Sequence, residues 1–359
     1  IKKIYCMNTY SIAVIPGDGI GSEVIDEGIK VLKLLEEQEE VTFQFEYFDW
    51  GSDYYRANGL MMPESGLESL KNFDAIYFGA VGDPEIPDHI TLNGLLIPMR
   101  KGLDQYVCLR PNILSPGVVS PLVNPNVDLV VVRENTEGEY ASVGGNFKPD
   151  TEDEVAIQTA IFTRKGTERI IRYAFEVAIS RSKTPKLTSV TKSNAQRYGM
   201  VFWDKVFQEV ASEYPNVETE SLLVDAACMD LIRRPSEFDV IVGSNLFGDI
   251  LSDIAAVITG SMGLAPSANI NPEKQFPSLF EPVHGSAPYI VCKNISNPIA
   301  AVLSAGMMLR HLGESELDEK IIRSVYQLIE DKKVLTPDLG GTASTQQLGD
   351  ELVSILSRI

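Results

Sequence analysis

Apolar and polar residues follow one another along the chain in patterns that predict both strands and helices. Short alternating or continuous apolar runs predict strands at 10–15, 41–50, 74–79, 127–132, 154–163, 187–191 and 238–242. Apolar residues at helical spacing predict helices at 22–35, 63–72, 166–180, 197–214, 248–258, 297–312 and 345–359. Because strands and helices take turns along the chain, the pattern predicts an α/β fold with a largely parallel sheet.

Two aspartates on one expected helix are the first candidate chemistry. Asp249 and Asp253 are four residues apart in the sequence GDILSD, so on a helix they lie one turn apart on the same face. A solvated acidic face is one explanation of the pair, and a hard divalent cation held between the carboxylates is the other. The neighbouring residues are apolar, and this narrow acidic stripe favours the cation. Asp225, which precedes the last expected strand, could reach the same point.

Cationic side chains stand where an anionic ligand could bind. Arg100 and Arg110 are ten residues apart, and Arg133 and Tyr140 follow an expected strand, where α/β sheets bind their ligands. Arginine binds carboxylates through two parallel hydrogen bonds, which favours a dicarboxylate, although surface arginines would look the same in the sequence. Lys192 follows another expected strand and is a candidate base.

Two glycine-containing segments could contact a cofactor. The sequence PGDGIG at 16–21 joins the first expected strand to the first expected helix, but it lacks the GxGxxG spacing and is a weak signal. Residues 280–298, FEPVHGSAPYIVCKNISNP, predict an ordered loop that offers backbone N–H groups to a ligand.

Length, charge and cysteine usage narrow the classes of function. The 359 residues suffice for two domains, and a formal net charge of −19 repels phosphate backbones, so we expect no nucleic-acid partner. No apolar run reaches the length of a membrane span. The four cysteines have no metal-binding or disulfide spacing, which suits a reducing cytoplasm. They are Cys6, Cys108, Cys228 and Cys292. Residues 1–6 precede Met7 and are expected to be an extension outside the fold.

Taken together, six motifs resemble one family. PGDGIG, the two arginines of R-x9-RP, RENTEGEY, GDILSD, EPVHGSAP and TPDLGGTAS are similar to the metal-dependent decarboxylating β-hydroxyacid dehydrogenases, the isocitrate and isopropylmalate dehydrogenase family. The tartrate and D-malate branch is the most similar. The resemblance implies a two-lobed α/β fold, not a Rossmann fold, with a long mixed sheet through both lobes. It also implies a homodimer with shared active sites.

The same resemblance implies domain bounds. The first, cofactor-side lobe would comprise 7–107 and 259–359, and the second lobe, with the metal-binding aspartates, would comprise 108–258. Residues 146–165 match the position of the family's dimer arm.

Roles of individual residues are also implied by the resemblance. Arg100, Arg110 and Arg133 match the residues that bind the substrate carboxylates, and Tyr140 and Lys192 match the catalytic pair. The Mg²⁺ or Mn²⁺ ligands match Asp225, Asp249 and Asp253, with Asp225 donated across the dimer. The cofactor's adenosine site matches His284, Gly285, Ser286, Ala287, Tyr289, Ile290 and Asn297.

The implied function is NAD- and metal-dependent oxidative decarboxylation of a 2-hydroxy acid with a C3 carboxylate, with K⁺ as a further candidate ion. Relatives that use NAD usually carry Asp where this chain has Tyr289, and relatives that use NADP carry Lys. Ile290 matches the NAD type, so NAD is predicted.

D-Malate, with tartrate, is the predicted substrate. Isopropylmalate is the alternative, because Leu95, Leu96 and Ile97 are apolar, whereas Asp88, His89 and Asn93 make the same loop polar. Isocitrate enzymes place Ser where this chain has Gly94, which disfavours isocitrate. A non-catalytic regulatory subunit is a different class of function, but such subunits usually lose catalytic residues that this chain retains.

Overall fold

The structure, a computed structural model, describes residues 8–359. The expected extension at 1–6, Cys6 and the expected start of the first lobe at Met7 lie outside the described residues. The strands are β1 (Asn8–Gly17), β2 (Val41–Tyr47), β3 (Ala75–Ala80), β4 (Val107–Ile113), β5 (Asp128–Glu134), β6 (Gly144–Phe147), β7 (Val155–Gln158), β8 (Lys186–Thr191), β9 (Glu218–Leu223), β10 (Val240–Gly243), β11 (Pro266–Ile270) and β12 (Ser278–Pro282).

The helices alternate with these strands, as the sequence predicts. They are α1 (Gly21–Gln38), α2 (Ser52–Asn58), α3 (Gly66–Leu70), α4 (Asp88–Gly94), α5 (Leu96–Gly102), α6 (Arg164–Arg181), α7 (Gly199–Ala211), α8 (Val224–Arg233), α9 (Asn245–Ile258), α10 (Ile299–Leu312), α11 (Ser315–Asp331) and α12 (Thr345–Leu356). Within the described part of the chain, no helix is both long and apolar enough to cross a membrane.

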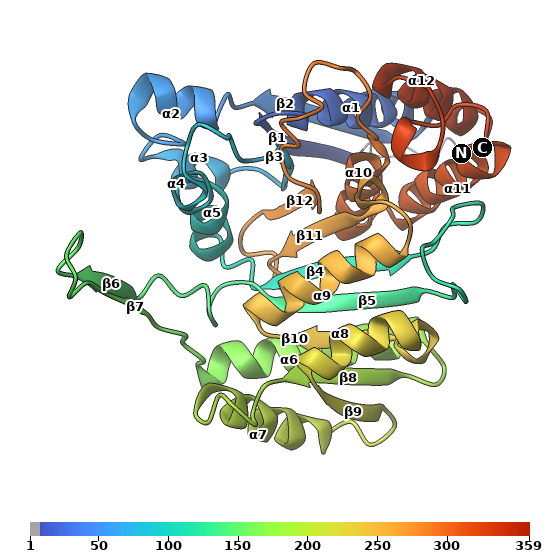
Figure 1. The fold of residues 1–359 in the computed structure, drawn as a ribbon. Coiled ribbons are helices and arrows are strands. Elements are labelled where there is room, and N and C mark those ends of the chain that lie inside the picture. Colours follow the sequence, from blue (N-terminus) through green and yellow to red (C-terminus); the bar gives the residue numbers. More distant parts are fainter. Residues whose placement is uncertain (1–7) are drawn as a thin grey trace, which may run out of the picture. The chain divides into compact units, whose positions relative to one another are not determined.

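Ten of the described strands form one mixed sheet, in the order β2-β1-β3-β12-β11-β4-β5-β10-β8-β9 (Figure 1). The pairs β1–β2, β1–β3, β3–β12, β5–β10, β8–β10 and β8–β9 are parallel, and β11 and β12 are antiparallel. This confirms the predicted α/β class with a largely parallel sheet. β6 and β7 pair with each other in a separate ribbon, and every residue of both strands is exposed.

The chain divides into two compact units. The first comprises the residues up to Gln105, Arg110–Val127 and Ala256–Ile359, and the second comprises Tyr106–Leu109 and Asp128–Ala255. The lobe bounds that the family resemblance implies, 7–107 with 259–359 and 108–258, stay a prediction.

Three expected elements differ clearly in extent from the sequence prediction. The strand expected at 154–163 is reduced to β7. Phe280–Pro282 belongs to β12 and is not part of a loop, because its backbone pairs with β11. The expected helix at 63–72 is reduced to α3, since Pro63 accepts a turn hydrogen bond from Gly66 before the helix begins. The loop that follows β12 is therefore shorter than expected and starts from a fixed strand end.

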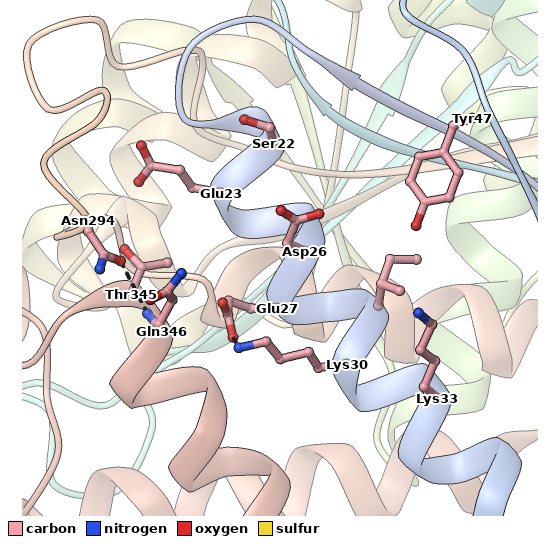
Figure 2. A pocket seen from close by; sticks show the side chains of 11 residues that line it. Ser22, Glu23, Asp26, Glu27, Lys30, Lys33, Tyr47, Asn294, Thr345 and Gln346 are labelled. Atoms are coloured by element: carbon pink, nitrogen blue, oxygen red, sulfur yellow. Dashed lines mark hydrogen bonds and ion pairs between the residues drawn. The ribbon is translucent and has the colours of Figure 1, made fainter.

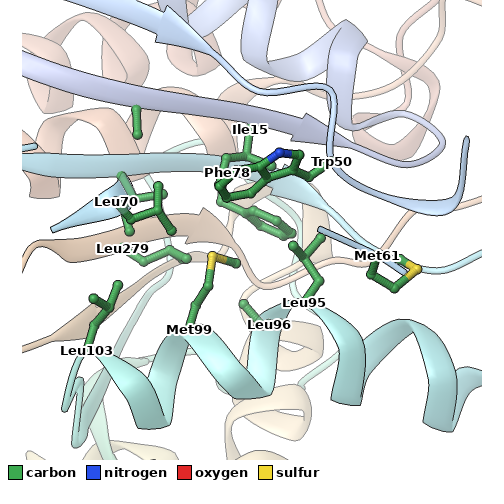
Figure 3. Close-up of a cluster of buried hydrophobic side chains, with 12 residues drawn as sticks. Ile15, Trp50, Met61, Leu70, Phe78, Leu95, Leu96, Met99, Leu103 and Leu279 are labelled. Carbon is green, nitrogen blue, oxygen red and sulfur yellow. The ribbon is translucent and has the colours of Figure 1, made fainter. Parts of the chain in front are cut away.

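In the first unit, an apolar cluster holds α5 in place. Leu96 and Met99 on α5 are buried against Phe78 of β3 and Leu279 of β12 (Figure 3). Burying an apolar side chain of this size contributes about 1.5–3 kcal/mol. Because Arg100 follows Met99 directly, this packing also fixes where its guanidinium can lie.

Protonation of His311 is expected to destabilise the first unit in acid. His311 lies in α10 with its ring centroid 5.6 Å from that of Phe280, and burial lowers the pKa of its imidazole to about 4. In an unfolded chain the pKa of histidine is about 6.5. The unfolded state therefore binds more protons between these two values, and stability falls as the pH is lowered through that window.

The variant His311→Phe should lose this acid sensitivity while keeping an aromatic ring against Phe280. We compare the free energies of unfolding of the two proteins by urea titration. When the pH is lowered from about 7.5 to about 4, the value for the variant should rise by roughly 1–3 kcal/mol relative to that for wild type. Parallel pH profiles for the two proteins would contradict the prediction.

Candidate active site

Helix α9 carries two of the expected metal ligands and begins directly after β10. Gly248, in its first turn, approaches β5 so closely that a Cβ atom there would be 2.6 Å from the Cβ of Arg133. Only a glycine lets the helix lie this close to the strand end. Asp249 and Asp253 follow on α9; the Asp249 side chain is 32% exposed, and Asp253 is exposed.

A hydrogen-bond network joins three of the predicted residues. The Arg133 side chain is only 1% exposed, and it donates from Nε (3.1 Å) and Nη2 (2.7 Å) to Oδ1 of Asn245. Its Nη1 donates to Oδ1 of Asp249, whose Oδ2 accepts a 2.9 Å hydrogen bond from the Tyr140 hydroxyl. The structure thus brings Arg133, Tyr140 and Asp249 together. Asn245 was not among the predicted site residues, although its place as a polar residue in the turn after a strand was a signal.

Glutamates of the RENTEGEY motif fix the segment between Arg133 and Tyr140. Glu134 accepts hydrogen bonds from the backbone N–H groups of Thr136 and Glu137, and burial raises its pKa to about 7. The carboxylate of Glu137 accepts from the backbone N–H (2.8 Å) and hydroxyl (2.7 Å) of Thr163, the N-cap residue of α6. The sequence analysis did not assign a role to either glutamate.

Gln158, the last residue of β7, holds the backbone on both sides of Tyr140. Its side-chain Nε2 donates to the carbonyl of Glu139 (3.4 Å) and to that of Ala141 (3.0 Å). The position of Tyr140 along the chain is therefore fixed by the ribbon as well as by the network above.

Lys192 and Asp225 form a separate pair in the second unit. Lys192 follows β8, Asp225 lies in the first turn of α8, and Nζ is 2.5 Å from Oδ1. The hydrogen bond from Lys192 lowers the pKa of the Asp225 carboxyl. Among the described residues of one chain, no three acidic, histidine or cysteine side chains form a group that could hold a metal. The site of three aspartates, with Asp225 donated across the dimer, stays a prediction.

The residues on α9 nevertheless fit a divalent cation. Two carboxylates one helical turn apart provide the hard oxygen ligands that Mg²⁺ and Mn²⁺ prefer. The side chain of Asp249 is partly accessible, and that of Asp253 is exposed, so neither carboxylate is closed off by packing.

Arg100 and Arg110, in the first unit, are buried, which excludes the alternative of surface arginines. Nη2 of Arg100 lies 2.9 Å from Oε1 of Glu281, which also accepts a 2.7 Å hydrogen bond from Asn269. Nε of Arg100 is buried and has no hydrogen-bond partner within residues 8–359. A donor left in this state suits an anionic ligand.

The loop after β12 lies against the PGDGIG turn. The carbonyl of Ser286 accepts a 2.9 Å hydrogen bond from the backbone N–H of Ile20. At Gly19, where φ is 60°, a Cβ atom would be 2.1 Å from that same carbonyl oxygen, so glycine is required. The two segments that the sequence suggested for a cofactor therefore lie side by side.

Several residues of this loop fit a bound nucleotide. Nε2 of His284 is buried with no hydrogen-bond partner in the described part of the chain, and burial lowers the pKa of the imidazole. A Cβ atom at Gly285 would meet nothing within 4 Å, so the backbone there is open to a ligand. The Tyr289 side chain is 86% exposed, and Asn297 donates a 2.9 Å hydrogen bond to Asp338.

Comparison with known proteins identifies the family of this chain. The family model described as isocitrate/isopropylmalate dehydrogenase matches residues 11–352. The chain belongs to this family. A probable tartrate dehydrogenase/decarboxylase of Agrobacterium vitis is 50% identical to this chain, and the match spans 98% of this chain and 99% of the relative. A decarboxylating D-malate dehydrogenase of Escherichia coli is 49% identical, and the match spans 98% of this chain and 100% of the relative. The crystal structure of isocitrate dehydrogenase from Methylococcus capsulatus superposes with a TM-score of 0.88 at 37% identity, covering 97% and 99%.

Membership of the isocitrate/isopropylmalate dehydrogenase family confirms the resemblance, the fold class and the class of oxidoreductase that the motifs predicted. Enzymes of this family use NAD and a divalent metal ion in general, which fits the open loop after β12 and the paired carboxylates of α9.

A separate hollow of about 400 Å³ lies along α1, next to the N-terminus of α12 (Figure 2). Lys30 bridges Glu27 and Asp350 at its edge, and its other lining includes Asp26 and Tyr47. It contains none of the residues that the sequence predicted for catalysis or binding, and we do not assign it to the active site.

Adding one methyl group at Gly248 should disturb this site. Gly248→Ala would place Cβ 2.6 Å from Cβ and 3.0 Å from Cα of Arg133, so α9 must shift. Although alanine favours helices, overpacking of this kind costs about 1–3 kcal/mol. Thermal unfolding should show a lower midpoint for Gly248→Ala, whereas Gly145→Ala, which meets nothing within 4 Å in the same unit, should match wild type. Equal midpoints for the two variants would contradict the close packing.

Proposed function

We propose that this chain oxidises D-malate with NAD and releases the C3 carboxylate as CO₂, giving pyruvate, and that tartrate is a second substrate. The main support for this proposal is the hydrogen-bond network in which Asp249 accepts from both Arg133 and Tyr140. It combines a carboxylate-binding cation, a proton donor and a metal ligand. The names of the relatives from Agrobacterium vitis and Escherichia coli support this substrate class.

The substrate carboxylates are bound by arginine. Arg100, Arg110 and Arg133 are all buried, so a carboxylate that reaches them exchanges water for charge-assisted hydrogen bonds. Three guanidinium groups also provide the local positive charge that a protein of net charge −19 otherwise lacks.

Two side chains move the protons. Lys192 is the general base that takes the proton of the C2 hydroxyl while C2 loses a hydride. The C3–carboxylate bond then breaks, CO₂ leaves, and the electron pair stays on the substrate as an enolate. Tyr140 donates its hydroxyl proton to C3, which completes pyruvate.

The cofactors supply the remaining chemistry. When bound, NAD accepts the hydride, and Mg²⁺ or Mn²⁺ withdraws electrons from the C2 oxygen. Asp249 and Asp253, with Asp225 from a partner subunit, would hold the divalent ion, and K⁺ is a further candidate. The adenosine part would contact the loop from His284 to Asn297.

A homodimer follows from the same assignments. Because Lys192 and Asp225 are paired within one chain, an Asp225 that is donated across the dimer brings Lys192 with it. The ribbon β6–β7, within the expected arm at 146–165, exposes apolar side chains of Phe147 and Ile157 that a second subunit would cover. We place this enzyme in the cytoplasm, since Cys228 and Cys292 are free thiols.

The surroundings of α4 favour D-malate over isopropylmalate. Leu95 and Leu96, which made isopropylmalate attractive, are buried in the apolar cluster and so are used by the core. The exposed residues of this segment include Asp88, His89 and Asn93, and Asn93 donates a 2.7 Å hydrogen bond to the His89 carbonyl. A small or polar group on C3 suits these side chains better than an isopropyl group.

The substrate assignment is tested by kcat/KM for D-malate, tartrate, isopropylmalate and isocitrate, measured with NAD and Mn²⁺. D-Malate should give the highest value, with tartrate accepted, because the exposed residues of α4 are polar apart from Leu92 and suit a small or polar group on C3. A value for isopropylmalate more than about tenfold above that for D-malate would overturn the assignment. No turnover of any of the four acids would favour a regulatory subunit.

Variants of the two proposed catalytic residues should lose different steps of the reaction. Lys192→Met removes the base and should abolish oxidation of D-malate, while Tyr140→Phe should impair loss of CO₂ and protonation more than hydride transfer. Removing a general acid or base typically costs about 10²–10⁴-fold. Supplying oxaloacetate and following CO₂ release isolates the second half-reaction, on which Lys192→Met should retain activity. Identical losses for both variants in both half-reactions would contradict the assignment of separate steps to Lys192 and Tyr140.

A further inference from the structure

Glu139 caps a helix that lies 105 or more positions further along the chain. Its Oε1 accepts a 2.8 Å hydrogen bond from the hydroxyl of Ser244, just before α9. Its Oε2 accepts a 3.1 Å hydrogen bond from the backbone N–H of Leu246, the second residue of α9. Helix N-termini have unsatisfied N–H groups and a partial positive charge, so a carboxylate is favourable there. Because both oxygens are used, the start of α9 is fixed in rotation as well as in position.

The next residue, Tyr140, contacts the same helix one turn later. Its hydroxyl donates to Asp249, three residues beyond Leu246 and on the same side of α9. The backbone around Tyr140 is held independently by Gln158. Arg133 also holds the Asp249 carboxylate directly. With the tyrosine anchored from one side, the spacing between phenol and carboxylate therefore depends on the Glu139 contacts as well as on Arg133.

We propose that Glu139 is a positioning residue for the decarboxylation half-reaction, which it serves by holding the Asp249 carboxylate at the Tyr140 hydroxyl. The inference rests on the proposed function, because it assigns Tyr140 as the proton donor and Asp249 as a metal ligand. Glu139 itself touches neither substrate nor cofactor in this role.

The chain offers a matched control two residues earlier. The carboxylate of Glu137 likewise accepts a backbone N–H and a hydroxyl at a helix N-terminus, that of α6. α6 carries none of the residues proposed for catalysis. Glu137→Ala and Glu139→Ala therefore remove the same charge and the same kind of cap. Of the two side chains, only that of Glu139 contacts the start of α9, so Glu139→Ala should affect the site more.

The first measurement is the rate of CO₂ release from oxaloacetate in wild type, Glu139→Ala, Tyr140→Phe and the double variant. Glu139→Ala should slow it about 10–100-fold, as for other residues that orient metal ligands. With Mn²⁺ saturating for every variant, the same change in the Tyr140→Phe background should cost less than about threefold, because the phenol that Glu139 positions is already absent. Equal losses in both backgrounds, or a loss no larger than that in Glu137→Ala, would overturn the proposal.

The second measurement is the dissociation constant for Mn²⁺ alone, followed by electron paramagnetic resonance. Glu139→Ala should weaken Mn²⁺ binding about tenfold relative to Glu137→Ala, since α9 no longer holds its carboxylates in one orientation. Equal constants would overturn the proposal. If wild type releases no CO₂ from oxaloacetate, the proposed function fails, and Mn²⁺ binding still decides the role of Glu139. Should Glu139→Ala not fold, Glu139→Gln, which keeps one acceptor oxygen, should show a smaller change in the same direction.

Discussion

Burial of the Arg133 guanidinium is the constraint on which the second unit's site depends. A charge that is 1% exposed costs several kcal/mol unless its hydrogen bonds are made and its charge is balanced. Asn245 accepts two of these hydrogen bonds and Asp249 supplies the opposite charge. Both partners lie on α9, so the helix must start immediately after β10 and pass close to β5, which only a glycine at 248 permits. The arginine thus determines where α9, and with it Asp253, can lie.

The first unit also contains a buried arginine, Arg100, whose charge is balanced by a different carboxylate. Arg100 is held by Glu281 at the end of β12, and Asn269 of β11 shares that carboxylate. The helix that carries Arg100 is in turn fixed by the apolar cluster around Met99. In both units a carboxylate balances the buried arginine. The amide of Asn245 accepts from Arg133 itself, whereas the amide of Asn269 donates to the carboxylate that holds Arg100, so both guanidinium groups are held in fixed positions. Such preorganisation lowers the cost of binding a dianion.

Much of the fold and of the site could be predicted from local patterns. The expected strands and the helix with Asp249 depend on periodicity within a few residues, and the family motifs depend on short segments. What could not be predicted depends on contacts between distant segments. The pairing of β12 with β11 turns Phe280–Pro282 into a strand, although glycine and proline nearby suggested a loop. Leu95 and Leu96 looked like pocket residues in the sequence, but the structure buries both in the apolar cluster. The contact between Glu139 and Leu246 spans 107 positions and has no local signal.

The exposed ribbon has a consequence for how this enzyme can change over time. Gln158 belongs to β7, yet its amide fixes the carbonyls on both sides of Tyr140. A substitution that alters how β6 and β7 pair should therefore displace the Tyr140 hydroxyl, even though every residue of the two strands is exposed. Surface strands are usually free to vary in sequence. Here we expect substitutions in the ribbon to be constrained by Tyr140, so the proposed dimer contact and the proposed proton donor would change together.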